Sequence, residues 1–330
     1  MKIFSASKSP SKTDPLENTD TQEGGLNPRR TPVVEEYHPL DLTSIVTGSL
    51  GERWQAVLKQ TRRVRSRPTE KSVHDLRVAI RRLMAALDIL RMVMPKSGTS
   101  KLRKELHAHL KSLSALRDTQ VQVIEVESLV KEYPDFIRFL KLLKREETIR
   151  VKRASKEIVK MDLESMESSL GKIISKTDTY RSIAPMRENS YSILRGMLAK
   201  IFIRTTVLRK QIQNADSQKI DLIHELRLVY KRFRYSVEIL QPIFPRVSEP
   251  LLNRMSEYQR SLGAIHDKAM LISALDSYLK SADVKGASRH NSKARQYSRL
   301  RDFLSKNLEE HTNRFLTMMD ELDVFWEHLT

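Results

Sequence analysis

The chain of 330 residues contains no cysteine, which excludes disulfide bonds, thiolate metal sites and a cysteine nucleophile. It also lacks any run of about 18 apolar residues, so we expect no membrane-spanning helix. No apolar stretch of signal-peptide length follows the N-terminus, and we therefore expect no secretion. These absences together favour a reducing, cytoplasmic location. From residue 41 onward only seven glycines and seven prolines occur, and alternating strand patterns are missing.

The charge of the chain is unbalanced, with 59 Lys and Arg against 41 Asp and Glu and a net charge of +18. The first 40 residues carry five basic and six acidic side chains, so the positive excess lies entirely in the remainder. They are rich in Ser, Thr, Pro, Asp and Glu, a composition that predicts a disordered tail over 1–40. The basic remainder should attract polyanions such as nucleic acid, acidic membranes or polyphosphate.

Apolar residues recur every three or four positions through most of 41–330, which predicts an all-α domain. Internal similarity at a nearly fixed offset divides this domain into one repeat over about 41–180 and another over about 181–330. We predict two tandem four-helix bundles related by pseudo-twofold symmetry, with a basic groove or channel between them. The expected long helices cover 42–66, 69–93, 99–132, 135–174, 186–213, 217–241, 247–280 and 287–318. A short segment at about 320–328 should dock through Val324, Phe325 and Trp326.

One helical motif occurs twice, 150 residues apart. The first copy reads SVHDLRVAIRRL over Ser72–Leu83, and the second reads LIHELRLVYKRF over Leu222–Phe233. The matched pairs are His74 with His224, Arg77 with Arg227, Arg81 with Lys231, and Arg82 with Arg232. The second copy continues its basic face with Arg234.

The spacing of three and four residues places each basic set on one helix face, at the border of the apolar seam. Like charges at this spacing repel by about 0.2–0.5 kcal/mol per pair, and a multiply charged anion would remove the repulsion. Arginine grips phosphate oxygens with two parallel N–H bonds, and lysine adds a compact charge. A solvated basic face is the alternative interpretation, but repetition at a fixed offset favours an anion site.

Further basic residues could extend the site on neighbouring helices: Arg62, Lys111, Lys200, Arg204 and Arg260. A second matched pair, Asp118 and Asp267, could hold the Arg or His side chains in place, although surface salt bridges would also explain it. Catalytic motifs are missing, because neither a zinc-protease helix, a Gly-rich phosphate loop nor a serine elbow occurs. We therefore expect no enzyme, no cofactor and no metal, although phosphate transfer through His74 or His224 remains a minor alternative.

The doubled His-x-x-Arg-x-x-x-(Lys/Arg)-Arg motif, with Leu-x-x-(Leu/Ile)-x-Asp in the next helix, resembles the CHAD domain, the conserved histidine α-helical domain. The resemblance covers roughly 41–330. It implies two four-helix bundles across a basic channel that binds inorganic polyphosphate, and a location on polyphosphate granules. Carried over, it makes His74, Arg77, Arg81 and Arg82 ligands from one half, and His224, Arg227, Lys231, Arg232 and Arg234 ligands from the other. The chain departs from the family pattern at Met84, where a further Arg is usual, and at His266, which matches Arg117.

Many members of that family carry a triphosphatase-like domain before the CHAD domain, whereas here only a short tail stands there, so we expect a stand-alone binding module. The alternative function is general polyanion binding, to nucleic acid or to an acidic membrane. Aromatic residues make up only 6% of the chain and do not interleave with the basic stripes, which disfavours base stacking.

Overall fold

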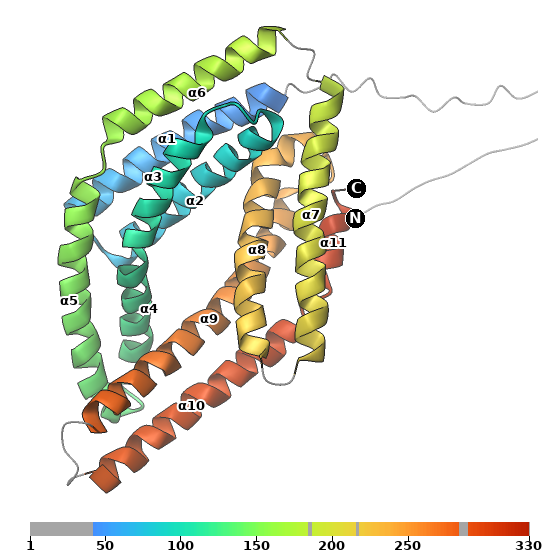
Figure 1. Cartoon of the computed structure of the whole chain (residues 1–330). Coiled ribbons are helices and arrows are strands. Elements are labelled where there is room, and N and C mark those ends of the chain that lie inside the picture. The colour runs from blue at the N-terminus through green and yellow to red at the C-terminus, as the bar shows by residue number, and fades with distance from the viewer. Residues whose placement is uncertain (1–41, 184–186, 216–217, 284–289, 330) are drawn as a thin grey trace, which may run out of the picture. The chain divides into compact units, whose positions relative to one another are not determined.

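The computed structural model describes residues 42–183, 187–215, 218–283 and 290–329, all of which belong to the unit Pro39–Thr330. The predicted tail over 1–40 lies outside the described residues. Within the described ranges the chain is helical and contains no strand, which confirms the all-α prediction (Figure 1). The symmetry of two tandem bundles stays a prediction. None of the described helices combines the length and the apolar character that a bilayer span requires.

The helices are connected by short segments, and two of the connections contain a single 3-10 turn. In chain order they are α1 (Leu42–Ser66), α2 (Glu70–Val93), α3 (Thr99–Ser112), α4 (Ser114–Leu129), η1 (Pro134–Phe136), α5 (Ile137–Val159), α6 (Leu163–Ile183), α7 (Arg187–Asn214), α8 (Lys219–Leu240), η2 (Gln241–Ile243), α9 (Glu249–Asp283), α10 (His290–Leu316) and α11 (Glu321–Glu327).

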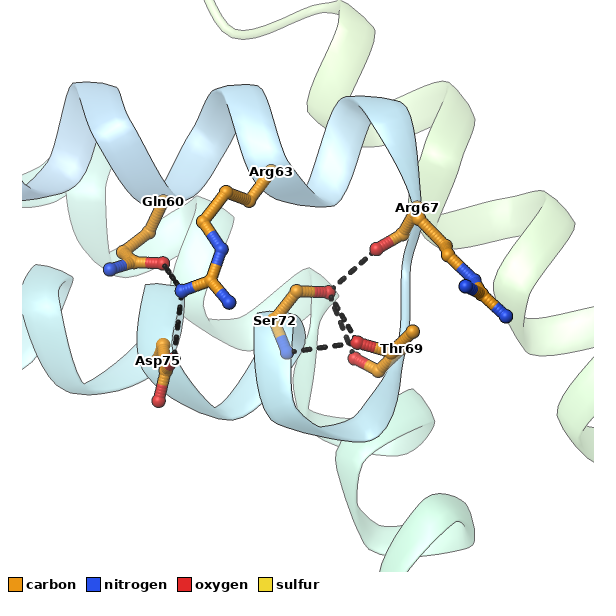
Figure 2. A network of polar contacts seen from close by, with 6 residues as sticks. All are labelled: Gln60, Arg63, Arg67, Thr69, Ser72 and Asp75. Atoms are coloured by element: carbon orange, nitrogen blue, oxygen red, sulfur yellow. Dashed lines mark hydrogen bonds and ion pairs between the residues drawn. The ribbon is translucent and has the colours of Figure 1, made fainter.

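The turn between α1 and α2 is held by a small polar network (Figure 2). The Thr69 hydroxyl accepts a hydrogen bond from the Ser72 backbone amide at 3.2 Å and so caps α2. The Ser72 hydroxyl donates to the Arg67 carbonyl at 2.7 Å, and Arg63 forms an ion pair with Asp75 at 3.2 Å. These contacts define where α2 begins, and hence where the first basic stripe lies along the helix.

The helix predicted over 99–132 is in fact two helices, α3 and α4, divided at Leu113. Next to this break the Leu110 carbonyl accepts Nη1 of Arg77 at 3.0 Å and the Ser114 hydroxyl at 3.1 Å. Such side-chain contacts compete with the backbone ladder and interrupt a helix. The prediction of one continuous helix was wrong because the competing donor, Arg77, comes from another helix.

The helix predicted over 135–174 is likewise divided, into α5 and α6. A carboxylate oxygen of Asp162 accepts the Ser165 amide at 3.0 Å, as an N-cap does. At the end of α5, Arg65 of α1 donates to the carbonyls of Ile158 and Met161, at 3.2 and 3.1 Å. Asp162 is therefore a sequence signal for the start of α6. The amphipathic periodicity continues on both sides of it, which is why the sequence predicted one uninterrupted helix.

The main hydrophobic core surrounds α2 and α8. α2 packs against α1, α3, α4, α7 and α8, and α8 packs against α1, α7 and α9. Each basic stripe borders an apolar seam, a row of apolar residues three or four positions apart, and both seams are buried here. Their residues are Val73, Leu76, Ile80, Leu83, Leu87 and Leu90 on α2, and Ile223, Leu226, Tyr230, Phe233, Val237 and Leu240 on α8. The last short helix, α11, docks as expected: Phe325 is buried, and Trp326 stacks on Phe202 with ring centroids 4.7 Å apart.

A second hydrophobic cluster joins α4, η1 and α5 to α9 and α10. Beside it, Lys268 of α9 pairs with Glu125 of α4 at 2.7 Å. The two predicted repeats contact each other through several helix pairs, which include α2 with α8 and α4 with α9. These are the four helices that carry both matched motifs, and Figure 1 shows them bordering one region of the fold.

Truncation of the core face of α8 should destabilise the protein far more than truncation of its outer face. Leu226 is fully buried, whereas Leu228, two residues later, is 53% exposed. We expect Leu226→Ala to lower the free energy of unfolding by about 2–5 kcal/mol, because it leaves a cavity. Leu228→Ala, the matched control, should change it by less than about 0.5 kcal/mol. Urea denaturation of both variants measures the difference, and equal losses would contradict this packing of α8.

Candidate anion-binding site

The two basic stripes meet where α2 approaches α8. Arg77 and Arg81 come from α2, and Arg227 and Lys231 come from α8. Charges of the two stripes repel each other: Arg227 repels Arg77, and Arg81 repels both Arg227 and Lys231. We call Arg77, Arg81, Arg227 and Lys231 the cation cluster. The structure thus brings together four sequence-predicted residues that lie about 150 positions apart.

Partial burial makes these like charges costly. Desolvation lowers the pKa of Lys231 from 10.5 to about 6, and Arg227, Arg81 and Arg77 reinforce the shift. Burial, followed by repulsion from Arg81, lowers the pKa of Arg77 to about 10. The pKa values of Arg81 and Arg227 are lowered too, in both cases mainly by desolvation. The cluster is therefore short of negative charge in the free protein.

Two carboxylates face the cluster, one from each predicted repeat. Asp118 lies on α4 and stabilises the charged forms of Arg77, Arg81 and Arg227. Asp267 lies on α9 and does the same for Arg227 and Lys231. Burial raises the pKa of Asp267, although Arg227, Arg117 and Lys231 oppose that rise. The four basic side chains thus outnumber the two acids, and the supporting role of Asp118 and Asp267 stays a prediction.

The two arginines at matched positions have different partners. Arg77 is only 6% exposed and donates to the Leu110 carbonyl at 3.0 Å and to the Ser114 hydroxyl at 2.9 Å. In the second copy Gly263 stands at the position that matches Ser114, so this hydroxyl is missing. The buried Nε of Arg227 has no hydrogen-bond partner. An arginine with an unused donor is better able to bind a ligand than one held by its own fold.

The histidines of the two stripes also differ. His74 is exposed at the edge of the cluster, and its pKa is lowered by desolvation and by Arg81, Arg77 and Lys231. Nδ1 of His224 lies 2.9 Å from Nδ1 of His266, so one ring donates and the other accepts. Burial lowers the pKa of His266 to about 3, with Arg227 and His224 contributing. At neutral pH the pair is uncharged and adds no cation to the cluster.

Three residues near the cluster were not predicted from the sequence as part of the site. His266 and Arg117 occupy matched places on α9 and α4, and Arg117 forms an ion pair with Glu70 at the start of α2. Their alignment across the two repeats was a usable signal. Tyr235, buried on α8, interacts electrostatically with Arg81 and Arg227. No sequence signal distinguished it from a core residue.

Two further predicted ligands, Arg82 and Arg234, converge on Glu238. Nε of Arg82 lies 3.2 Å from this carboxylate, and Nη2 of Arg234 lies 2.6 Å from it. Arg234 also donates to the Ser256 hydroxyl at 2.9 Å. The three residues form an ion-pair network that ties α2 to α8, and this accounts for the burial of Arg234 without any ligand.

The remaining predicted residues lie on other surfaces. Lys200, Arg204 and Arg232 line a pocket of about 470 Å³ between α7 and α8, and Arg204 pairs there with Glu225. Arg62 on α1, Lys111 on α3 and Arg260 on α9 are exposed on the helix surfaces. In the part of the chain that the structure describes, no three His, Cys, Asp or Glu side chains are grouped so that they could hold a metal ion.

Comparisons with known proteins agree with this architecture. The profile of the CHAD domain family matches residues 48–276. The crystal structure of the CHAD domain from the plant Ricinus communis is 16% identical, with a TM-score of 0.57 over 87% of this chain and 91% of that one. PptA from Streptomyces chartreusis is 15% identical, with a TM-score of 0.58 over 84% of this chain and 99% of that one.

No curated protein matches the chain. At such low identities the two solved structures bear on the fold alone. The family profile, however, spans more than half of the sequence and includes both copies of the doubled motif. This chain is therefore a member of the CHAD domain family.

Proposed function

We propose that this protein binds inorganic polyphosphate at the cation cluster, as a cytoplasmic protein that associates with polyphosphate granules. The observation that carries the proposal is the convergence of Arg77, Arg81, Arg227 and Lys231 from two helices, where Asp118 and Asp267 offset them in part. A fold normally avoids placing like charges together in a desolvated site. Such an arrangement is useful when a multiply charged anion completes it.

A densely charged polymer suits the cluster better than a single phosphate. The cations come from both predicted repeats, so a ligand must offer negative charge to two helices at once. A chain of linked phosphates offers one charge per residue along a narrow backbone, and it can extend past the cluster to exposed His74. Many such contacts make binding both tight and dependent on salt.

Nucleic acid is the alternative polyanion, and the surface of the protein argues against it. Binding of single strands relies on exposed aromatic rings on which bases stack. Among the described residues the exposed large hydrophobic side chains are all Ile, Leu, Val or Met. Tyr235, which interacts with Arg81 and Arg227, is buried.

Removal of two cluster arginines should abolish tight polyphosphate binding. We expect Arg81→Gln/Arg227→Gln to weaken the affinity for long-chain polyphosphate at least about 100-fold, since each charged hydrogen bond contributes about 1.5–3 kcal/mol. The slope of log Kd against log salt should fall by about one for each lost phosphate contact. Salt-titrated fluorescence anisotropy measures both, with duplex DNA as the competitor.

The matched control for this experiment is Arg62→Gln/Arg260→Gln, which removes the same charge from exposed positions outside the cluster. It should weaken binding only a few-fold. An equal loss in both double variants would mean that the overall field of the protein binds polyanions, and it would refute the cluster as the site. Complete displacement by duplex DNA would favour the alternative function.

Polyphosphate binding should take up protons. Lys231, with a pKa of about 6, is mostly neutral at pH 7, and a bound polyanion would restore its charge. The affinity should therefore increase as the pH falls from 8 to 6. The groups around it are His74, Arg77 and Arg81 on α2, Arg227 and His224 on α8, and His266 and Asp267 on α9.

Calorimetry at pH 7 in two buffers of different ionisation enthalpy counts the protons taken up. Wild-type protein should give an uptake that Lys231→Arg largely removes, because arginine keeps its charge. A pKa that rises on binding means tighter binding at low pH, so release of protons would contradict the proposal. Lys210→Arg, an exposed lysine on α7, serves as the control and should leave the uptake unchanged.

We further propose that the protein does not transform its ligand. Of the two candidate histidines, His224 is paired with His266 rather than with a carboxylate that would orient a base. Incubation with triphosphate or long-chain polyphosphate should release no phosphate above the buffer level. Phosphate release that His74→Ala or His224→Ala abolishes, or an acid-labile phosphate on either residue, would show an enzyme instead.

A further inference from the structure

The outer face of α7 exposes aliphatic side chains. Ile193 is 41% exposed, Ile203 60% and Val207 39%, and Leu228 on neighbouring α8 is 53% exposed. Positions 193, 200, 203 and 207 lie on one side of a helix, while the opposite side of α7 packs into the main core through Leu194, Leu198 and Leu208. Clustered apolar exposure of this kind marks an interaction surface, unlike single exposed residues.

Basic residues lie among these aliphatic side chains. Lys200 and Arg204 of α7 and Arg232 of α8 line the same pocket. No Asp or Glu occurs in the sequence from 189 to 214. Arg204 is paired with Glu225, whereas Lys200 and Arg232 have no acidic partner among the described residues. The face is therefore both apolar and positively charged.

A pocket of about 470 Å³ opens on the same face. Its lining combines the cations Lys200, Arg204 and Arg232 with the apolar side chains Met92, Met197, Ile201, Leu228 and Val229. Met197 and Ile201 are buried and form the apolar lining beside the basic groups. An acyl chain attached to a phosphate has this combination of chemistries, and a bare polyphosphate does not.

We infer that the α7–α8 face, defined by Ile193, Lys200, Ile203, Arg204, Val207, Leu228 and Arg232, docks on the surface of an anionic lipid bilayer. An anionic bilayer binds both features of the face, because its acyl boundary takes up the aliphatic side chains and its acidic headgroups attract Lys and Arg. An apolar protein partner would have to bury the unpaired charges, and a soluble polyanion would gain nothing from the aliphatic side chains. The mode is peripheral, with the folded domain lying on the membrane.

This surface is distinct from the cation cluster. Lys200, Arg204 and Arg232 do not appear among the charges that shift the pKa values of Arg77, Arg81, Arg227 or Lys231. Membrane docking and polyphosphate binding can therefore fail independently of each other. One protein could hold the polymer on one side and a membrane on the other.

Vesicle flotation tests the inference with the full chain. Wild-type protein should float with vesicles of phosphatidylcholine that contain phosphatidylserine, and remain unbound with phosphatidylcholine alone. Ile203→Asn/Leu228→Asn should weaken flotation at least about tenfold, because two large aliphatic groups lose their burial. Lys200→Gln/Arg232→Gln should weaken it by about fivefold for each charge removed.

The matched control is Ile149→Asn/Val159→Asn, which replaces two exposed aliphatic residues of α5 and should leave flotation unchanged. The Asn variant of the α7–α8 face keeps its net charge, so it should bind polyphosphate as the wild type does. The inference is overturned if wild-type protein does not float, or if the α5 control loses as much binding as the α7–α8 variant. It is also overturned if Arg81→Gln/Arg227→Gln abolishes flotation, since the vesicles would then be held by the cation cluster.

Discussion

The repulsion among Arg77, Arg81, Arg227 and Lys231 is the constraint around which this fold is organised. The surrounding structure has to hold these four basic side chains close together, and it does so through apolar seams on α2 and α8 that are fully buried beside them. Glu238 adds an ion-pair link between the same two helices through Arg82 and Arg234. Stability from the core thus offsets an unfavourable charge arrangement, as expected where a site is prepared for a ligand.

The matched arginines of the two repeats, Arg77 and Arg227, are held by different contacts. Arg77 is held in place by the Leu110 carbonyl and the Ser114 hydroxyl, and the same contacts coincide with the break between α3 and α4. The matched region of the second repeat contains Gly263, and α9 runs through it as one helix. The buried Nε of Arg227 has no hydrogen-bond partner. One arginine is rigid and preorganised, and the other is available, so the two halves of the site are unequal.

The all-α class, the apolar seams and the convergence of the matched stripes could be predicted from periodicity and repetition alone. The break between α3 and α4 could not, because Arg77 acts on the Leu110 carbonyl from another helix. The break between α5 and α6 had one local signal, the capping residue Asp162, and the contacts of Arg65 with the end of α5 come from a distant part of the sequence. The sequence also could not separate the basic residues into classes. Arg81, Arg82 and Arg232 look alike in a helical stripe. In the structure, however, Arg81 belongs to the cation cluster, Arg82 pairs with Glu238, and Arg232 lines the pocket beside α7. Which neighbour each arginine meets depends on the crossing of α2 and α8, a tertiary feature.

α8 links the two surfaces through its helical geometry. Lys231 and Arg232 are adjacent in the sequence and therefore point about 100° apart around the helix. The first turns towards the cation cluster and the second towards the pocket beside α7. Because one rigid helix carries both residues, a polymer bound at the cluster and a bilayer at the α7–α8 face would be held at a constant separation. Neither ligand would need to displace the other, and a conformational change would not be required to accommodate both.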